Sequence, residues 1–169
     1  MDPTHDYASW SQLPAAAKQL LLLAAEHWDE NALSESYIEQ ALEEYDGELE
    51  VLVSAFRYYF YRSRSERALT LADQVLERLQ QDASLPREWE ELRPTLMAGK
   101  DDPIVRLYLA AYAARGLLLA KLGRLDEARL ISCRVKELDD RREFCASTVF
   151  DVLTAAAEED GVGCGTSNA

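Results

Sequence analysis

Histidine and cysteine are the side chains through which this chain could most readily bind a metal or act as a nucleophile, and it has few of them. The histidines are His5 and His27, and the cysteines are Cys133, Cys145 and Cys164. Neither histidine lies at metal-ligand spacing from the other or from a cysteine. We interpret Cys133 and Cys145 as small apolar side chains at helix interfaces, and Cys164 as a bystander or a site of modification.

Two further patterns have part of a functional motif but lack the rest. The glycine-rich segment GVGCGTS has no lysine and no following helix, both of which a phosphate-binding loop needs. Glu43 and Glu44 could form an acid–base pair only inside a cleft that shifts their pKa values, so we interpret them as surface charge. The sequence therefore predicts a protein that is not an enzyme and that uses no cofactor and no metal.

Acidic residues outnumber basic ones, and the excess is concentrated near the N-terminal end. The 169 residues have a net charge of -13, and residues 1–50 hold twelve acidic residues but only one basic residue, Lys18. Nucleic acids and anionic membranes both attract positively charged proteins, so the charge argues against both as partners. A basic or mixed-charge protein partner is compatible with this negative charge.

Composition predicts one helical domain. Apolar residues make up 48% of the chain, while glycine (7) and proline (5) are few and alanine, leucine and glutamate are abundant. We find no apolar run of about twenty residues and no secretory pattern. Together with the odd number of cysteines, this predicts a cytoplasmic protein.

The apolar residues recur with the period of an α-helix, and no segment alternates like a strand. The pattern predicts helices near residues 14–28, 31–45, 48–62, 66–81, 87–92, 102–122 and 125–138, and a last helix that ends near 159. Pro94 should end the short helix near 87–92, and Asp102 with Pro103 should begin the long one. Residues 160–169 should be disordered.

The helices also repeat. Ser34 aligns with Ala68 at a period of about 34 residues, a length typical of repeated helix pairs. Ala68 in turn aligns with Ala128 once a proline-rich insertion at about 81–106 is set aside. We interpret Gly116 and Ala128 as small residues that let two antiparallel helices approach closely. Gly123, between them, should permit the tight turn.

The segment YAARGLLLAKLGRLDEA resembles the tetratricopeptide repeat (TPR) family. Tyr112 occupies the large aromatic position, Gly116 and Ala128 the small positions, and Gly123 the turn. Leu119 stands where an aromatic residue is usual. After this pair, Asp140 stands where the family usually has a proline. In the middle pair Tyr59 and Ala68 match the family pattern, but Phe56 occupies a small position. The first pair matches by its length and its apolar pattern.

The resemblance implies an all-α fold in which antiparallel helix pairs stack as a right-handed α-solenoid in a single domain, 1–159. The repeats would cover about 13–46, 47–80 and 109–142, with an insertion at about 81–106, a capping helix at about 142–159 and a tail at 160–169. The alternative is an irregular helical bundle.

In this family the first helix of each pair lines a concave groove. By register, the candidate partner-binding residues are Gln19, Leu23, Glu26, His27, Arg57, Phe60, Tyr61, Leu117 and Lys121, and the same register also selects Val53. The family's carboxylate clamp, which holds acidic C-termini of heat-shock chaperones with lysine and asparagine, is absent. Its positions hold Gln19, Leu23, Ser54, Ala110 and Ala114.

The segment FRYYFYRSRSER, residues 56–67, mixes aromatic residues and arginines and allows two interpretations. It could form a platform for a peptide. Alternatively, Phe56 and Tyr59 belong to the core, Tyr58 packs on the neighbouring pair, and the arginines are solvated.

The sequence as a whole predicts a module that binds a protein or peptide segment, as an adaptor, assembly chaperone or accessory factor. The alternative is a structural homo-oligomer in which the groove, or the insertion with Trp89, Leu92 and Leu96, packs on another copy. Small three-repeat secretion chaperones have a similar size and acidity. The segment LDDRREFCASTVFDVL is similar to small repeat proteins associated with bacterial nitrogen fixation.

Overall fold

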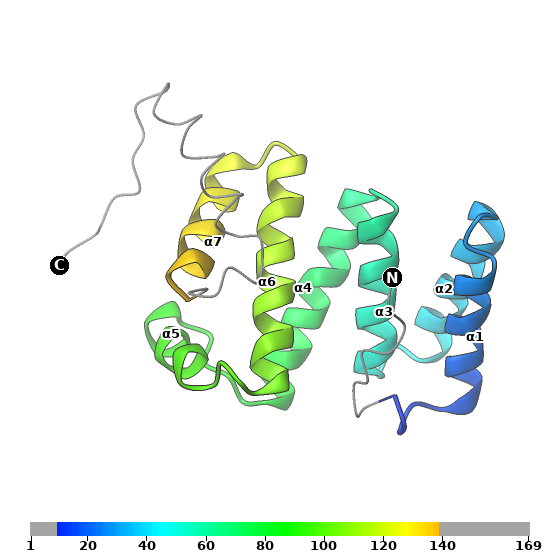
Figure 1. Cartoon of the computed structure of the whole chain (residues 1–169), viewed down its shortest axis with the longest axis horizontal. Helices are drawn as coiled ribbons and strands as arrows, with labels where there is room; N and C mark the ends of the chain where they lie inside the picture. Colours follow the sequence, from blue (N-terminus) through cyan, green and yellow to red (C-terminus); the bar gives the residue numbers. More distant parts are fainter. Residues whose placement is uncertain (1–9, 139–169) are drawn as a thin grey trace. The chain divides into compact units, whose positions relative to one another are not determined.

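The computed structural model describes residues 10–138, and within this range the chain is all-helical, with seven helices and no strand (Figure 1). The helices are α1 (Ala15–Glu26), α2 (Asn31–Glu44), α3 (Leu49–Tyr61), α4 (Ser65–Asp82), α5 (Trp89–Ala98), α6 (Pro103–Lys121) and α7 (Leu125–Leu138). The predicted all-α class is confirmed. The predicted capping helix at 142–159 and the tail at 160–169 lie outside the described residues, as do His5, Cys145 and Cys164.

The chain divides into two compact units, Met1–Leu71 and Ala72–Ala169, and the boundary falls inside α4. We describe each unit by itself. The single domain 1–159 that the repeat pattern predicts stays a prediction.

In the first unit, α1 and α2 form a helical hairpin, and α3 packs against both of them. The core includes Ala17, Leu21 and Ala24 from one face of α1. Ser34 of α2 is fully buried, and its hydroxyl donates a hydrogen bond to the Ala24 carbonyl, with 2.7 Å between the oxygens. A small side chain at this position therefore lets α1 and α2 pack closely, as its alignment with Ala68 suggested.

In the second unit, α6 and α7 form the corresponding pair, and Gly116 lies where they touch. A Cβ atom added at Gly116 would lie 2.9 Å from Cγ2 of Ile131 and 3.5 Å from the Ser132 hydroxyl oxygen. Ala128 is completely buried. The prediction that small residues allow a close helix–helix contact here is confirmed.

The turn between α6 and α7 depends on Gly123. Its φ is +77°, in the left-handed region that side chains other than glycine rarely adopt. The Arg124 amide then donates back to the Leu119 carbonyl over 2.9 Å, which satisfies a backbone group at the end of α6. The predicted turn is confirmed.

The start of α6 is also as predicted. A carboxylate oxygen of Asp102 accepts hydrogen bonds from the amides of Ile104 (2.7 Å) and Val105 (3.4 Å), and Pro103 is the first helical residue. By length and composition α6 could cross a membrane, with a mean hydropathy of 1.3 over 18 residues, although core helices of soluble proteins pass the same test. Here Gly116 and its neighbours on α6 pack against α7.

The insertion differs from its prediction. Instead of a short helix that stops before Pro94, α5 continues through Pro94 to Ala98. Proline removes one backbone hydrogen bond and crowds the preceding turn. Leu92 and Leu96, on either side of it, are both buried, and α5 contacts α7, so the burial of these leucines offsets the cost. Leu92 and Leu96 of the insertion are therefore already covered within the second unit, whereas Met97 is exposed.

Candidate functional site

The predicted partner-binding residues on α1 lie on the face opposite its core residues. Gln19 and Glu26 are exposed, while Leu23 and His27 are half-buried. Leu22, beside them, is 54% exposed. This helix therefore presents large apolar side chains to solvent next to polar ones.

On α3 most of the circumference is buried, and the accessible stripe is narrow. Arg57 and Phe60 are half-buried, and Tyr61 is 61% exposed. Val53, which has the same register one turn earlier, is buried. Because α1 and α3 contact each other, we group the accessible residues as the α1–α3 surface. It comprises Gln19, Leu22, Leu23, Glu26, His27, Arg57, Phe60 and Tyr61.

The two remaining predicted residues belong to the second unit. Leu117 is half-buried on α6, and Lys121 is exposed in its last turn. Neither Arg57 nor Lys121 is free, since each already takes part in a hydrogen bond or another electrostatic or ring contact.

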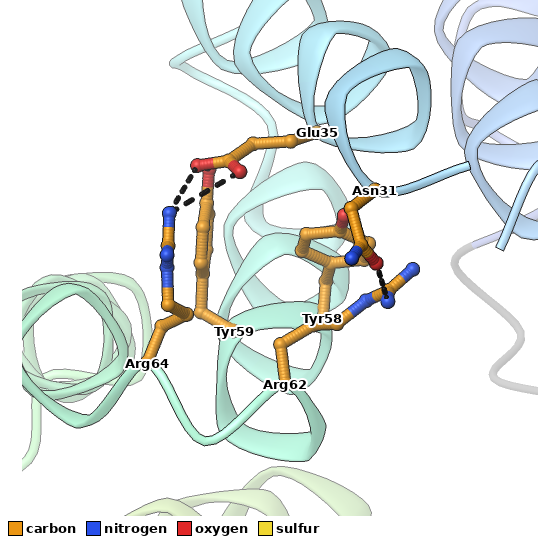
Figure 2. A pocket seen from close by; sticks show the side chains of 6 residues that line it. All are labelled: Asn31, Glu35, Tyr58, Tyr59, Arg62 and Arg64. Atoms are coloured by element: carbon orange, nitrogen blue, oxygen red, sulfur yellow. Dashed lines mark hydrogen bonds and ion pairs between the residues drawn. The ribbon is translucent and has the colours of Figure 1, made fainter. Parts of the chain in front are cut away.

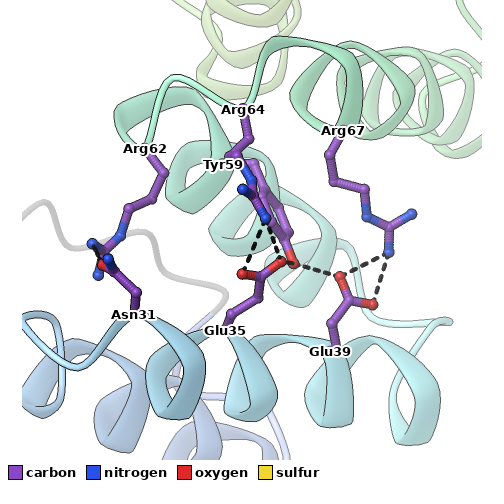
Figure 3. Close-up of polar contacts among 7 residues, drawn as sticks. All are labelled: Asn31, Glu35, Glu39, Tyr59, Arg62, Arg64 and Arg67. Atoms are coloured by element: carbon purple, nitrogen blue, oxygen red, sulfur yellow. Dashed lines mark hydrogen bonds and ion pairs between the residues drawn. The ribbon is translucent and has the colours of Figure 1, made fainter.

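A cluster of ionic contacts and hydrogen bonds joins α2 to the end of α3, to the turn that follows it and to the start of α4 (Figure 3). Arg64 reaches Glu35 with its Nη2 atom 3.2 Å from a carboxylate oxygen, and Arg67 reaches Glu39 at 2.9 Å. The Tyr59 hydroxyl donates to Glu39 over 2.5 Å and lies 3.4 Å from Glu35. We call these five residues the arginine–glutamate cluster.

The structure bears on the second interpretation of residues 56–67, in which the aromatic residues belong to the core and the arginines are solvated. Phe56 and Tyr59 are buried, and Tyr58 packs edge-to-face on Trp28, with the ring centroids 5.4 Å apart. These outcomes agree with the interpretation that the aromatic residues belong to the core. Arg64 and Arg67, however, are paired with α2 rather than only solvated. Sequence reasoning missed the cluster because its partners are far apart along the chain.

Burial raises the pKa of the Tyr59 hydroxyl above its ordinary value, and the hydrogen bond to Glu39 and the charges of both glutamates raise it further. Tyr59 therefore stays protonated, as a hydrogen-bond donor, well into the alkaline range. This makes it a poor candidate for a general base.

The raised pKa of Tyr59 predicts a loss of stability in alkali. Above about pH 10 the unfolded chain loses this proton while the folded chain keeps it, so the free energy of unfolding falls as the pH rises. We expect a shallower fall for Tyr59→Phe than for wild type, measured by urea unfolding at a series of pH values up to about 12. Equal slopes in the two proteins would contradict the assignment.

Arg62 lies beside the cluster and joins α3 to the loop after α1. Its guanidinium carbon is 3.9 Å from the centre of the Trp28 ring, and its terminal nitrogens donate to the Trp28 carbonyl and to Oδ1 of Asn31. Its Nε atom is buried without a hydrogen-bond partner. Arg62 thus holds the end of α3 against the first hairpin.

A shallow polar pocket of about 200 Å³ opens next to these side chains (Figure 2). It is lined by Asn31, Glu35, Tyr58, Tyr59, Arg62 and Arg64. Pockets that hold small-molecule ligands usually measure about 300–1,000 Å³. The charged groups that line this one are already paired, Arg64 with Glu35 and Arg62 with Asn31. The pocket is therefore better described as the edge of a structural joint.

The second unit has an aromatic cluster of its own. The Trp89 ring stacks on Tyr112 with centroids 6.3 Å apart, and Tyr112 stacks on Tyr108 at 5.9 Å. Arg134 of α7 lies 4.6 Å from the Trp89 ring centre and donates to the Tyr112 hydroxyl over 3.3 Å. Burial raises the pKa of Tyr108 to about 12. This cluster attaches α5 to α6 and α7.

The potential metal ligands and nucleophiles of the described residues lie apart. Nδ1 of His27 is 2.8 Å from a carboxylate oxygen of Glu30, three residues further along the chain. Cys133 is half-buried on α7. Within residues 10–138, no group of three histidine, cysteine or acidic side chains could hold a metal ion.

The chain is similar to a curated protein of Azotobacter chroococcum mcd 1 described as an "Uncharacterized 19.8 kDa protein in nifW 5'region". The two sequences are 32% identical over 140 residues, which cover 80% of this chain and 77% of the relative. No family model matches the chain, so this comparison gives the TPR resemblance no support. No solved structure matches it either.

Proposed function

Since the chain belongs to the same family as the Azotobacter chroococcum protein from the 5′ region of nifW, we propose that it is a non-catalytic, protein-binding accessory factor of nitrogen fixation that works in the cytoplasm. Its partner would be a segment of another protein. The description of the relative, which places it in the 5′ region of nifW, supports the nitrogen-fixation context.

The main support for binding is the α1–α3 surface. Two contacting helices leave Leu22 and Tyr61 more than half exposed. The repeat register places Tyr61 in a groove, and Leu22 lies next to Leu23, which the register selects on α1. Exposed large apolar and aromatic side chains are the usual anchors of protein interfaces. Arg57 and Phe60 on α3 add the mixture of charge and aromatic surface that such interfaces favour.

The arrangement that we propose for the helix pairs is TPR-like. Ser34, Ala68 and Ala128 occupy the same position of successive pairs, and each is completely buried. Gly116 adds a second small residue at the contact in the third pair. Close helix contacts at regular intervals are what a stack of helical repeats requires.

Two features support a role without catalysis. At the shallow polar pocket of the first unit, the charged side chains of Glu35 and Arg64 neutralise each other. Tyr59 is held in its protonated form by burial and by Glu39. A catalytic base needs a pKa near the working pH and an open approach to the substrate.

A matched pair of surface variants tests the proposal. An affinity-tagged chain would be expressed in its native host under nitrogen-fixing conditions, and proteins that co-purify would be measured by quantitative mass spectrometry. We expect the double variant Leu22→Ser, Tyr61→Ser to recover at least about ten-fold less of a specific partner than wild type, because each is an exposed anchor on the α1–α3 surface.

The control is Leu130→Ser, which removes a leucine that is 52% exposed on α7 of the second unit. It should recover the partner as well as wild type does. Equal recovery by the double variant would show that the α1–α3 surface is not the binding site. Loss in both the double variant and the control would indicate general misfolding, which circular dichroism would reveal.

A further inference from the structure

The first unit carries an excess of negative charge that its own arginines do not neutralise. Residues 10–71 contain eleven acidic side chains and five basic ones. Two of the five, Arg64 and Arg67, are paired with Glu35 and Glu39 inside the arginine–glutamate cluster. Arg62 is held between the Trp28 ring and Asn31.

Several of the remaining acidic residues lie on or beside the α1–α3 surface. Glu26 is in the last turn of α1, Asp29 follows the helix, and Glu50 is in the first turn of α3. Within residues 10–138, none of the three has a hydrogen bond or an ion pair to another side chain. At the α1 end of this surface, Leu22 is therefore accompanied by the carboxylates of Glu26 and Asp29, while Arg57, the cation of the surface, already has an interaction of its own.

From this juxtaposition we infer that the α1–α3 surface binds a cationic amphipathic segment of its partner protein. Apolar side chains of that segment would contact Leu22, Leu23 and Tyr61, and its lysines or arginines would approach Glu26 and Asp29. Complementary charge speeds association and excludes acidic competitors. The inference rests on the proposed function, and it specifies the chemistry of the partner.

A second copy of this chain fits the surface less well than a basic partner does. Residues 72–138 contain eleven acidic and eleven basic side chains, so the described part of the second unit has no net charge. Arg93, Arg115 and Arg124 are already paired with acidic residues of the same unit. The second unit therefore offers no excess of positive charge to a neighbouring first unit.

Two labelled model peptides test the inference on the full chain. Both are amphipathic helices of about 18 residues with the same leucine positions, and their polar positions are all lysine in one and all glutamate in the other. Binding would be measured by fluorescence anisotropy at low and at physiological salt. We expect the lysine peptide to bind at least about ten-fold more tightly than the glutamate peptide, and salt to weaken its binding.

Charge-reversal variants then locate the site. Glu26→Lys should weaken binding of the lysine peptide about five- to ten-fold. The variant should fold as wild type does, because a cation near the C-terminus of a helix is favourable. Glu43→Lys makes the same charge change at an exposed position of α2, and it should weaken binding less than about two-fold. Leu22→Ser should weaken binding as Glu26→Lys does.

Each contrary outcome has a distinct meaning. Equal effects of Glu26→Lys and Glu43→Lys would overturn the inference, because binding would then follow net charge alone. If the glutamate peptide binds as well, and Leu22→Ser weakens both, the surface is a binding site without preference for cations, so the inference fails and the proposed function stands. If neither peptide binds, or if Leu22→Ser does not change the affinity, the inference fails. The proposed function also fails only if the co-purification experiment shows that partner recovery does not depend on Leu22 and Tyr61.

Discussion

Replacing Gly116 with leucine is expected to cost the chain about 3 kcal/mol of stability or more, one of the two largest effects that we predict for a single substitution. Even the first added carbon atom would lie 2.9 Å from Cγ2 of Ile131, which is branched at Cβ and cannot turn aside freely. Alanine at this position gains about 1 kcal/mol in helix propensity, yet the clash should outweigh that gain and make Gly116→Ala destabilising as well.

Thermal and urea unfolding of purified proteins would measure these effects. Gly47→Ala is the control, since a Cβ atom there would have no neighbour within 4 Å, and its stability should stay within about 0.5 kcal/mol of wild type. If Gly116→Leu unfolds at the same urea concentration as wild type, α6 and α7 do not pack as described.

Leu96→Ala should give the second large effect, a loss of about 2–5 kcal/mol. Leu96 is completely buried although it lies in the insertion, just after the proline that would be expected to end its helix. Its removal would leave a cavity between α5 and the helices that cover it, so the cost includes lost contacts as well as lost burial.

The neighbouring residue provides the matched control. Met97 is 46% exposed on the same helix, and Met97→Ala should change the free energy of unfolding by less than about 1 kcal/mol. Hydrogen exchange would show where Leu96→Ala acts, and we expect faster exchange in α5 and α7. A neutral effect of Leu96→Ala would mean that the insertion is not part of the second unit.

The helices themselves were largely predictable from the sequence. The period of the apolar residues places them to within a few residues, apart from α5, and local signals fix several ends, as with Asp102 at the start of α6 and Gly123 after it. These signals act over one or two turns, so a single sequence contains them. The small residues Gly116 and Ala128 also predicted a close helix contact, because few other reasons explain glycine inside a long helix.

The continuation of α5 through Pro94 was not predictable in the same way. Local preference ends the helix there, and only the burial of Leu92 and Leu96 against the rest of the second unit reverses that preference. The arginine–glutamate cluster has a similar cause. Glu35 and Arg64 meet because α2 packs on α3, and nothing in either local sequence indicates which of several arginines will pair with which glutamate.

The candidate surface shows where register is informative and where it is not. Of the residues that the repeat register selects on α3, Tyr61 is exposed, Arg57 is half-buried and Val53 is buried. Register fixes the side of a helix on which a residue lies. How far neighbouring helices cover that side depends on their separation, which one sequence does not contain.

The helix α2 consists of 14 residues with four glutamates and no basic residue. Glu35, Glu39 and Glu43 recur once in each turn, so as an isolated peptide the helix would be weakened by repulsion between successive turns. The cations that relieve part of this repulsion, Arg64 and Arg67, lie beyond the whole of α3 in the chain. During synthesis α2 therefore leaves the ribosome before its counter-charges exist, and these ion pairs can form only once the chain has been made past Arg67.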